Sequence, residues 1–188
     1  MKKLTHYYHP VSRGMRTQKL LEIFEIPHEA VIVDYTKGEH RSEDYLKVNP
    51  LGRIPAIAHG DLFLTESGAI TLYLADLFPK EFKTPQVGTE ARGRLYEWLF
   101  FFQTTMEQTV LPVYSGADKT EIAAKLRGHL ESMRTRFVGP YVLGEDFTLL
   151  DVILHVELAW YKMMDIWPGD IEPYASFIEL TYERMNWE

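Results

Sequence analysis

The pattern of apolar residues changes once along this chain, and that change limits the fold class more than any single motif. Up to residue 78, short β-branched or aromatic runs alternate with segments of helical period, whereas beyond residue 88 every apolar stripe has helical spacing. Residues 79–88 hold two prolines, a glycine and several charges without an apolar period. The sequence therefore predicts an α/β domain at 1–78, a linker at 79–88 and an all-α domain at 89–188.

The N-terminal domain is predicted to follow the order β-α-β-α-β-β-α. A first strand at Leu4–Tyr8 precedes a helix that ends near Pro27, and the run Ala30–Val33 is typical of a buried strand. Pro55 interrupts the third strand, so we expect it at a sheet edge, at a bulge or in a cis peptide bond. The turn residues His59–Asp61 predict an antiparallel hairpin with the fourth strand.

The composition excludes several functional classes. With 46% hydrophobic residues among 188, the chain can bury a core, and its net charge of −7 disfavours a nucleic-acid partner. The chain has no cysteine, so it has no disulfide, no thiolate metal site and no thiol nucleophile. Any thiol chemistry must use a thiol that a ligand brings. No apolar run approaches the roughly 20 residues of a membrane span, and we expect a cytoplasmic protein without a membrane partner.

The helical domain contains one strong helix-start signal. Thr148 and Asp151 have the spacing of a capping box, and Phe147 and Val152 occupy the positions of a hydrophobic staple. The same Asp151 lies four residues before His155, but no third ligand accompanies this pair, and we predict no metal site.

Four motifs, in this order and spacing, carry a resemblance to a known family. The segments 8–14 (YHPVSRG), 49–56 (NPLGRIPA), 64–74 (LTESGAITLYL) and 144–151 (GEDFTLLD) resemble those of the cytosolic glutathione transferase superfamily. The first segment resembles the catalytic loop of its bacterial serine-type members. The resemblance covers essentially the whole chain and implies a thioredoxin-like N-terminal domain, an all-α C-terminal domain and glutathione as co-substrate.

The resemblance also implies roles for residues of the N-terminal domain. A cis Ile54–Pro55 bond would present the backbone of Ile54 to the cysteinyl residue of glutathione, while Ser67 would bind the γ-glutamyl carboxylate and Glu66 its ammonium group. Both Glu66 and Ser67 also suit the first turn of a helix, so capping is an alternative role for them. His40 and Arg53 are candidates for the glycine carboxylate, and each could equally be an exposed loop residue.

Ser12 is the predicted catalytic residue, because the resemblance places its hydroxyl at the glutathione sulfur. Lowering a thiol pKa from about 8.5 to about 6.5 requires about 2.7 kcal/mol, and a hydrogen bond to a charged group supplies about 1.5–3 kcal/mol. Arg13 would add positive potential at the glutathione site, and Arg41 is an alternative to His40. Tyr7 is the rival catalytic hydroxyl, since tyrosine-type members place one on this strand, and helix capping is the alternative role of Ser12.

The second substrate site is less well specified by the sequence. We expect its lining among the residues Tyr7, Val11, Phe102, Met106 and Trp160, although each is at least as well suited to the core or to a dimer interface. The apolar run 99–102 exceeds one helical stripe, and the resemblance implies a homodimer that would cover such a surface.

Two alternatives to a conjugating transferase stay open from the sequence. One is a non-catalytic interaction protein with the same fold, as in stringent-starvation-type proteins, but the joint presence of Ser12, Ile54–Pro55 and Glu66–Ser67 argues against it. The other is a glutathione-dependent isomerase or dehalogenase, which would share the glutathione site. Fold alone does not name the electrophile.

Overall fold

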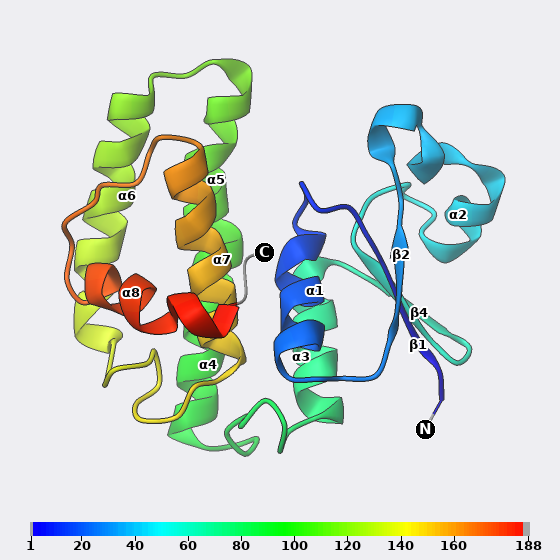
Figure 1. Cartoon of the computed structure of the whole chain (residues 1–188), viewed down its shortest axis with the longest axis horizontal. Coiled ribbons are helices and arrows are strands. Elements are labelled where there is room, and N and C mark those ends of the chain that lie inside the picture. Colours follow the sequence, from blue (N-terminus) through cyan, green and yellow to red (C-terminus); the bar gives the residue numbers. More distant parts are fainter. Residues whose placement is uncertain (1, 186–188) are drawn as a thin grey trace. The chain divides into compact units, whose positions relative to one another are not determined.

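The computed structural model describes residues 2–185 of the chain. They form two compact units, Met1–Glu81 and Phe82–Glu188, and the division falls within the segment 79–88 that the sequence indicated as a linker. Each unit has its own core and is described by itself (Figure 1).

The N-terminal unit is built on a four-stranded mixed sheet. Its strands are β1 (Leu4–Tyr8), β2 (Glu29–Ile32), β3 (Ala56–His59) and β4 (Leu62–Thr65), in the spatial order β2-β1-β3-β4. Strand β2 runs parallel to β1, whereas β3 is antiparallel to both β1 and β4. This is the sheet of a thioredoxin-like domain, and the predicted element order is confirmed.

Helices cover both faces of this sheet. Helices α1 (Gly14–Ile23) and α3 (Ser67–Leu77) lie side by side on one face, and α2 (Glu43–Val48) belongs to the other side (Figure 1). Two short 3-10 turns, η1 (Tyr35–Lys37) and η2 (Glu39–Arg41), connect β2 to α2. The core under α1 and α3 consists of fully buried aliphatic side chains, namely Leu20, Leu21, Ile57, Ile70 and Leu74.

Two details of the predicted sheet were wrong. Strand β2 is an edge strand, and Ile32 is 56% exposed, so the run Ala30–Val33 is not a buried strand. Its β-branched composition suits a pleated surface equally well, which is why composition alone did not reveal the edge position. The third strand does not include Pro55, because β3 begins at Ala56, while the Ile54–Pro55 bond is cis, which is one of the three settings expected for this proline.

A buried polar chain links β1 to α1 in the N-terminal unit. The ring nitrogen Nδ1 of His6 lies 2.8 Å from Oε1 of Gln18, and Nε2 of Gln18 donates to Glu22 and contacts Nε2 of His28. Since Nδ1 of His28 lies 2.7 Å from the carbonyl of Ile26, that nitrogen carries the proton and Nε2 accepts. The amide of Gln18 therefore presents its oxygen to His6, which donates from Nδ1. Burial holds the imidazole of His6 in the neutral form.

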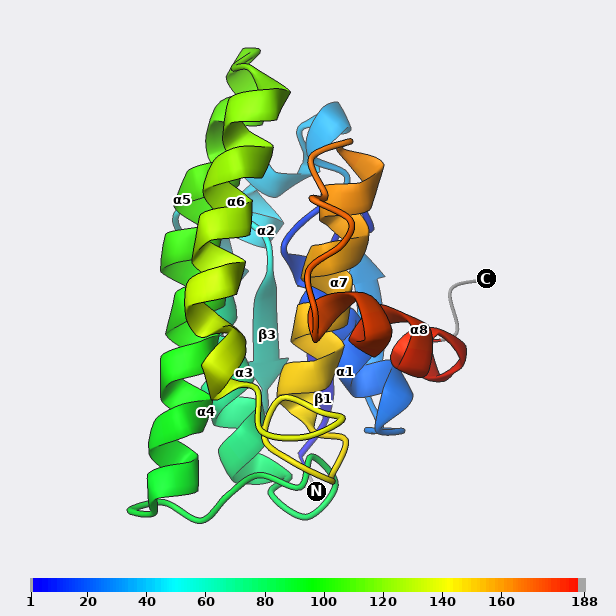
Figure 2. The ribbon, with the colours of Figure 1, turned by 90° about the vertical axis from the view of Figure 1, so that its left-hand side faces the viewer.

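The C-terminal unit consists of helices. Helix α4 (Glu90–Phe100), the π-helical turn η3 (Phe101–Met106) and α5 (Glu107–Val110) follow one another as a single long column, with α6 (Lys119–Met133) alongside it (Figure 2). Between α5 and α6 lies the 3-10 turn η4 (Leu111–Ser115), and η5 (Arg134–Arg136) follows α6. The last two helices are α7 (Leu149–Met163) and α8 (Tyr174–Met185).

Helix α7 is the central element of the C-terminal unit. All residues from Leu149 to Leu158 are buried, including the charged Glu157. The predicted capping box is present, since Asp151 accepts a 2.6 Å hydrogen bond from the backbone N–H of Thr148. Its other carboxylate oxygen accepts from the backbone N–H of Val142 at 2.8 Å. Asp151 therefore ties the preceding loop to the helix, and burial raises its pKa to about 6.

An aromatic cluster holds the ends of several helices together in this unit. The ring of Phe137 meets those of Trp98, Tyr174 and Phe177 at centroid distances of 5.6–6.3 Å. Phe137 continues the apolar spacing of α6 in the sequence, but that helix ends at Met133. Tyr182 follows the helical spacing of Phe177 and Ile178, yet it is 63% exposed. The buried partner there is Thr181, which is 2.6 Å from Nδ1 of His155.

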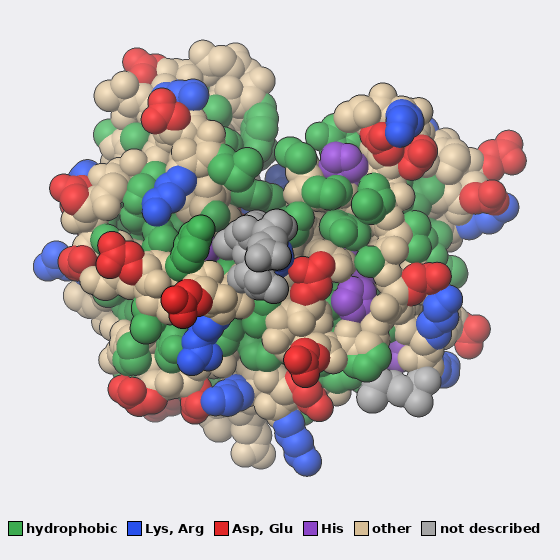
Figure 3. All heavy atoms as spheres, in the orientation of Figure 1, with side chains coloured by type: hydrophobic (Ala, Val, Ile, Leu, Met, Phe, Trp, Pro, Cys, Tyr) green, Lys and Arg blue, Asp and Glu red, His purple; other side chains and the backbone are tan. Residues whose placement is uncertain are grey.

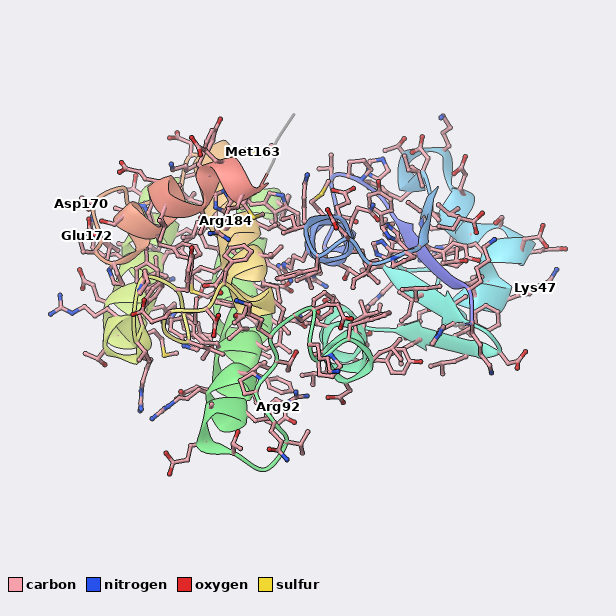
Figure 4. All side chains as sticks on the ribbon, turned by 60° about the horizontal axis from the view of Figure 1, so that its bottom comes forward. Lys47, Arg92, Met163, Asp170, Glu172 and Arg184 are labelled. Atoms are coloured by element: carbon pink, nitrogen blue, oxygen red, sulfur yellow. The ribbon has the colours of Figure 1, made fainter. Side chains whose placement is uncertain are left out.

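Two arginines fasten loops to the helices of the C-terminal unit. Arg184 of α8 lies over the rings of Tyr141 and Phe147, at 5.7 and 5.3 Å from their centroids (Figure 4). Arg92 of α4 is buried and donates to the carbonyl of Pro85 at 3.3 Å, which anchors the segment before α4. Each cation–π contact of Arg184 contributes about 0.5–2 kcal/mol.

The outer surface shows no segregation of charge on the face seen in Figure 3, where acidic and basic side chains are interspersed. Among residues 2–185, no helix is both long enough and apolar enough to cross a membrane.

The buried His6 makes the stability of the N-terminal unit depend on pH. Burial lowers the pKa of His6 to about 4, from an ordinary value of 6.5, so the unfolded chain binds a proton in this interval and the folded chain does not. The free energy of unfolding should fall as the pH drops from 6.5 to 4, by on the order of 3 kcal/mol from this residue. Urea titrations at several pH values, monitored by the Tyr and Trp signals, measure this slope.

The matched variant is His6→Asn, which keeps a side-chain N–H for Gln18 but does not titrate. We expect its unfolding free energy to decline less steeply between pH 6.5 and 4 than that of the parent. An identical slope in both proteins would show that His6 does not control the acid sensitivity. His155, whose pKa burial also lowers to about 4, contributes equally to both curves.

Candidate functional site

The strand register brings three separate segments to one end of the N-terminal sheet. Tyr7 of β1 pairs with Ala56 of β3, and Ala56 pairs with Thr65 of β4. The residues that follow β1, precede β3 and follow β4 therefore lie at the same end. These are the loop with Ser12, the Ile54–Pro55 dipeptide and the Glu66–Ser67 pair. These three segments, which lie between residues 12 and 67 of the sequence, thus form one continuous edge.

Ser12 lies in the short loop between β1 and α1. Its hydroxyl donates to the carbonyl of His9 at 2.7 Å and accepts from the backbone N–H groups of Gly14 at 3.1 Å and His9 at 3.4 Å. Met15 donates to the backbone carbonyl of Ser12, so the serine also begins the first turn of α1. The N-cap residue of α1 is Arg13, so Ser12 lies directly before the cap, at the N-terminal end of the helix.

The absence of a side chain at position 14 lets this loop approach the segment before β3. A Cβ atom at Gly14 would lie 2.6 Å from Cβ of Tyr8, 3.1 Å from Oγ of Ser12 and 3.3 Å from Cβ of Pro55. Ser12 and Pro55 thus lie on either side of the same small space. The sequence analysis quoted Gly14 within a motif but did not assign it this role.

Ile54 offers its backbone at this edge. Over residues 2–185, neither the N–H nor the carbonyl of Ile54 has a hydrogen-bond partner. In contrast, the neighbouring carbonyl of Arg53 accepts from the hydroxyl of Tyr45 and from Nδ2 of Asn49, both at 2.6 Å. The segment is therefore held firmly through Arg53, while one donor and one acceptor of Ile54 remain available to an extended peptide ligand.

The start of α3 forms the third part of the edge. Glu66 is exposed and has a φ of +66°, which is uncommon for a residue other than glycine, and Ser67 is buried as the first residue of the helix. Glu66 caps α3 without a side-chain hydrogen bond, so the first backbone N–H groups of this helix are not satisfied by the capping side chain. Such a terminus favours an anion. Backbone strain of this kind cannot be read from a Glu-Ser dipeptide.

His40 and the residues around Gly52 lie close together beside this edge. A Cβ atom at Gly52 would lie 2.7 Å from the carbonyl of His40 and 2.9 Å from a guanidinium nitrogen of Arg41, and Gly52 has a φ of +57°. Arg41 donates to the carbonyl of Leu51 at 3.2 Å, which makes it part of the fold. Nδ1 of His40 is buried and has no partner within the described part of the chain. His40 is thus better suited than Arg41 to contact a ligand, and the side chains of Arg53 and Arg13 are exposed.

Tyr7 points toward α2. Its ring meets that of Tyr45 edge-on at 6.0 Å, and both line a shallow hollow of about 360 Å³ with Val31, Val33 and Val48. On the same strand, His6 and Tyr8 stack on each other, and His6 contacts α1. Since side chains alternate between the two faces of a strand, Tyr7 lies on the face opposite α1.

The residues expected at the second substrate site have different environments. Phe102 and Met106 are 0% and 1% exposed, which corresponds to the core alternative that the sequence left open. Trp160 is half-buried in α7, whereas Val11 is 70% exposed and directly precedes Ser12. Within residues 2–185, no group of three or more His, Asp or Glu side chains could hold a metal ion.

Sequence reasoning missed two residues that support the site. Tyr45 and Asn49 hold the Arg53 carbonyl and so fix the segment before Pro55. Asn49 precedes a proline in a turn, where an Asn side chain commonly bonds nearby backbone groups, and this signal could have identified it.

Substituting Gly14 tests whether the close approach positions the site. In Gly14→Ala, the new methyl group overlaps Tyr8, and we expect the unfolding free energy to fall by about 1–3 kcal/mol, as in other overpacked sites. Gly128→Ala is the matched control, because a Cβ atom on this glycine of α6 meets nothing within 4 Å. That control should gain up to about 1 kcal/mol from helix propensity. Equal stabilities of the two variants in urea would contradict the assignment.

Comparison with known proteins identifies relatives of this chain. Residues 3–76 match the family model described as the glutathione S-transferase N-terminal domain. The chain is 32% identical over 165 residues to glutathione S-transferase PARB of Nicotiana tabacum, covering 79% of this chain and 76% of the relative. It is 33% identical over 154 residues to human glutathione S-transferase theta-1, covering 71% of this chain but 62% of that longer protein.

Solved structures show the same similarity. A glutathione transferase from Methylococcus capsulatus superposes with a TM-score of 0.80 at 27% identity, covering 97% of each chain. The human theta-class transferase in complex with the glutathione conjugate of 1-menaphthyl sulfate superposes with a TM-score of 0.81 at 25% identity, covering 98% of this chain and 82% of that one. The chain therefore belongs to the glutathione S-transferase family, and the comparisons support a glutathione transferase function.

Proposed function

We propose that this chain is a serine-type glutathione transferase that ionises the glutathione thiol at Ser12 for attack on a hydrophobic electrophile or a hydroperoxide. The observation that carries the proposal is the single sheet edge on which Ser12, Ile54 and the start of α3 lie together. Ser12 and Ile54 would serve the cysteinyl residue of glutathione, and the start of α3 would serve its γ-glutamyl end.

The γ-glutamyl end of glutathione fits the start of α3. Its carboxylate would accept from Ser67 and from the first backbone N–H groups of the helix, where the dipole favours negative charge. The exposed carboxylate of Glu66 would receive the ammonium group. The cysteinyl residue would use the unpaired backbone of Ile54, and His40 and Arg53 would hold the glycine carboxylate.

Ser12 would stabilise the thiolate by turning its hydroxyl proton from the His9 carbonyl to the sulfur. The two backbone N–H groups that donate to its oxygen remain in place during this rotation, and they polarise the hydroxyl as a donor. A hydrogen bond to a charged group contributes about 1.5–3 kcal/mol, against about 1 kcal/mol for the neutral bond that is given up. The helix terminus and the positive charge of Arg13 supply the remainder.

The thiol proton leaves to solvent, and the thiolate then forms the new bond. With an electrophilic carbon, sulfur donates its electron pair to carbon, and the leaving group departs with the pair of the broken bond. With a hydroperoxide, the thiolate attacks the terminal peroxide oxygen, the O–O bond breaks, and the alkoxide leaves as the alcohol after taking up a proton from solvent. The thiol of a second glutathione then displaces water from the resulting sulfenic acid and forms glutathione disulfide. The exposed Val11 next to Ser12 offers apolar contact for the second substrate, and the protein contributes thiolate stabilisation and proximity.

We further propose a homodimer in the cytoplasm, the compartment in which glutathione is kept reduced. The apolar run 99–102 exposes Phe100, and a second copy of the chain would cover this side chain. Sedimentation equilibrium should give twice the chain mass of 21.9 kDa, whereas a single chain mass at micromolar concentration would contradict the dimer.

The activity test compares Ser12→Ala with Tyr7→Phe. Each variant loses one hydroxyl group, and we expect Ser12→Ala to lower kcat with a chloronitrobenzene or cumene hydroperoxide roughly ten- to hundredfold. Its affinity for glutathione, measured by titration calorimetry, should change less than severalfold, because the sulfur contact is gained mainly on ionisation. Tyr7→Phe should retain most of the turnover.

The opposite pattern, with turnover lost in Tyr7→Phe and retained in Ser12→Ala, would make Tyr7 the activating residue. No saturable binding of glutathione at several millimolar would contradict the transferase function itself and favour an interaction protein with this fold.

A further inference from the structure

We infer that His9 is a positioning residue for Ser12, a role that rests on the proposed function of this serine in thiol activation. His9 is the last residue before Pro10 in the loop between β1 and α1. It contacts the loop through three polar atoms, of which two belong to its backbone and one to its ring.

The ring contact determines which nitrogen of the neutral imidazole carries the proton. The backbone N–H of Val11 donates to Nδ1 of His9 at 3.2 Å. Because a backbone N–H can only donate, Nδ1 must carry a free electron pair, and the proton of the neutral ring lies on Nε2. Pro10 contributes no N–H group, so this bond satisfies the first backbone donor that follows the N–H of His9.

The backbone contacts transmit the position of His9 to the reactive hydroxyl. Its carbonyl accepts from Oγ of Ser12 at 2.7 Å, and its N–H donates to the same oxygen at 3.4 Å. The bond from Val11 to the ring is therefore a further hydrogen bond that closes the same loop. Without it, the backbone between residues 9 and 12 gains freedom, and the hydroxyl that must face the sulfur is held less tightly.

A second element holds the ring in this orientation. The imidazole of His9 meets the ring of Tyr35 edge-on, with centroids 4.7 Å apart and an interplanar angle of 66°. Tyr35 begins η1, directly after the segment in which Val33 donates to the carbonyl of Tyr8 at 2.7 Å. The loop with Ser12 is thus supported from the β2 side of the sheet through a residue that does not need to touch the substrate.

The variants His9→Ala and His9→Asn separate the hydrogen bond from the packing of the ring. Alanine removes both, whereas the Oδ1 atom of asparagine accepts from a backbone N–H two residues later, as in an Asx turn. We expect His9→Ala to lower kcat at saturating glutathione about three- to tenfold. His9→Asn should restore most of this loss, although it lacks the contact with Tyr35.

The decisive readout is the pKa of the bound glutathione thiol, followed by the ultraviolet absorbance of the thiolate in the binary complex. His9→Ala should raise this pKa in the same direction as Ser12→Ala but by less, with the dissociation constant of glutathione changed less than twofold. In the Ser12→Ala background, His9→Ala should have no further effect on the thiol pKa, because its influence passes through the serine. Thermal unfolding of each variant shows whether the chain remains folded.

The outcomes distinguish the failure of this inference from that of the proposed function. If Ser12→Ala leaves the thiol pKa unchanged, thiol activation by Ser12 is wrong, and the role of His9 falls with it. If Ser12→Ala raises the pKa of the bound thiol but His9→Ala does not, only the positioning role of His9 is overturned. The same conclusion follows if His9→Ala shifts this pKa equally in the parent and in the Ser12→Ala background. The same holds if His9→Asn is as impaired as His9→Ala, because the backbone hydrogen bond would then not be the cause.

Discussion

The pairing of β3 with both β1 and β4 is the constraint on which the functional edge depends. Its register places Tyr7, Ala56 and Thr65 in one row, and the three segments next to that row carry the donors and acceptors of the site. A shift by one residue would turn every side chain of a strand to the other face and separate Ser12 from Pro55. The buried core formed by α1, α3 and β3 maintains this register, because only one face of each strand carries the apolar side chains that this core buries.

The chemistry proposed for this edge needs little stabilisation energy, but it needs the serine hydroxyl in a precise position. In the proposed mechanism, no residue of the chain forms a covalent bond with the substrate; the thiol comes with glutathione, in agreement with a sequence that has no cysteine. A serine hydroxyl already held by two backbone N–H groups needs only to redirect one proton. Backbone contacts of His9 and the absence of a side chain at Gly14 support that orientation. Neither feature is chemically reactive.

Local patterns predicted the element order, the hairpin of β3 and β4 and the capping box of α7, because each depends on residues close in sequence. Ser12, Ile54 and Ser67 were proposed through the family resemblance, and the register that joins them depends on long-range pairing. Burial was harder to predict. Ile32 was expected in a buried strand and is exposed, since apolar character does not distinguish an edge strand from a central one. Residue type predicts neither the positive φ of Glu66 nor the hydrogen bond from Val11 to His9.

The most direct test of the account is a crystal structure of the protein with reduced glutathione bound. The account predicts the sulfur within hydrogen-bond distance of Oγ of Ser12, the cysteinyl backbone paired with the N–H and carbonyl of Ile54, and the γ-glutamyl carboxylate at the start of α3. A sulfur placed at the hydroxyl of Tyr7, in the hollow beside α2, or a glutathione bound away from this sheet edge would contradict it.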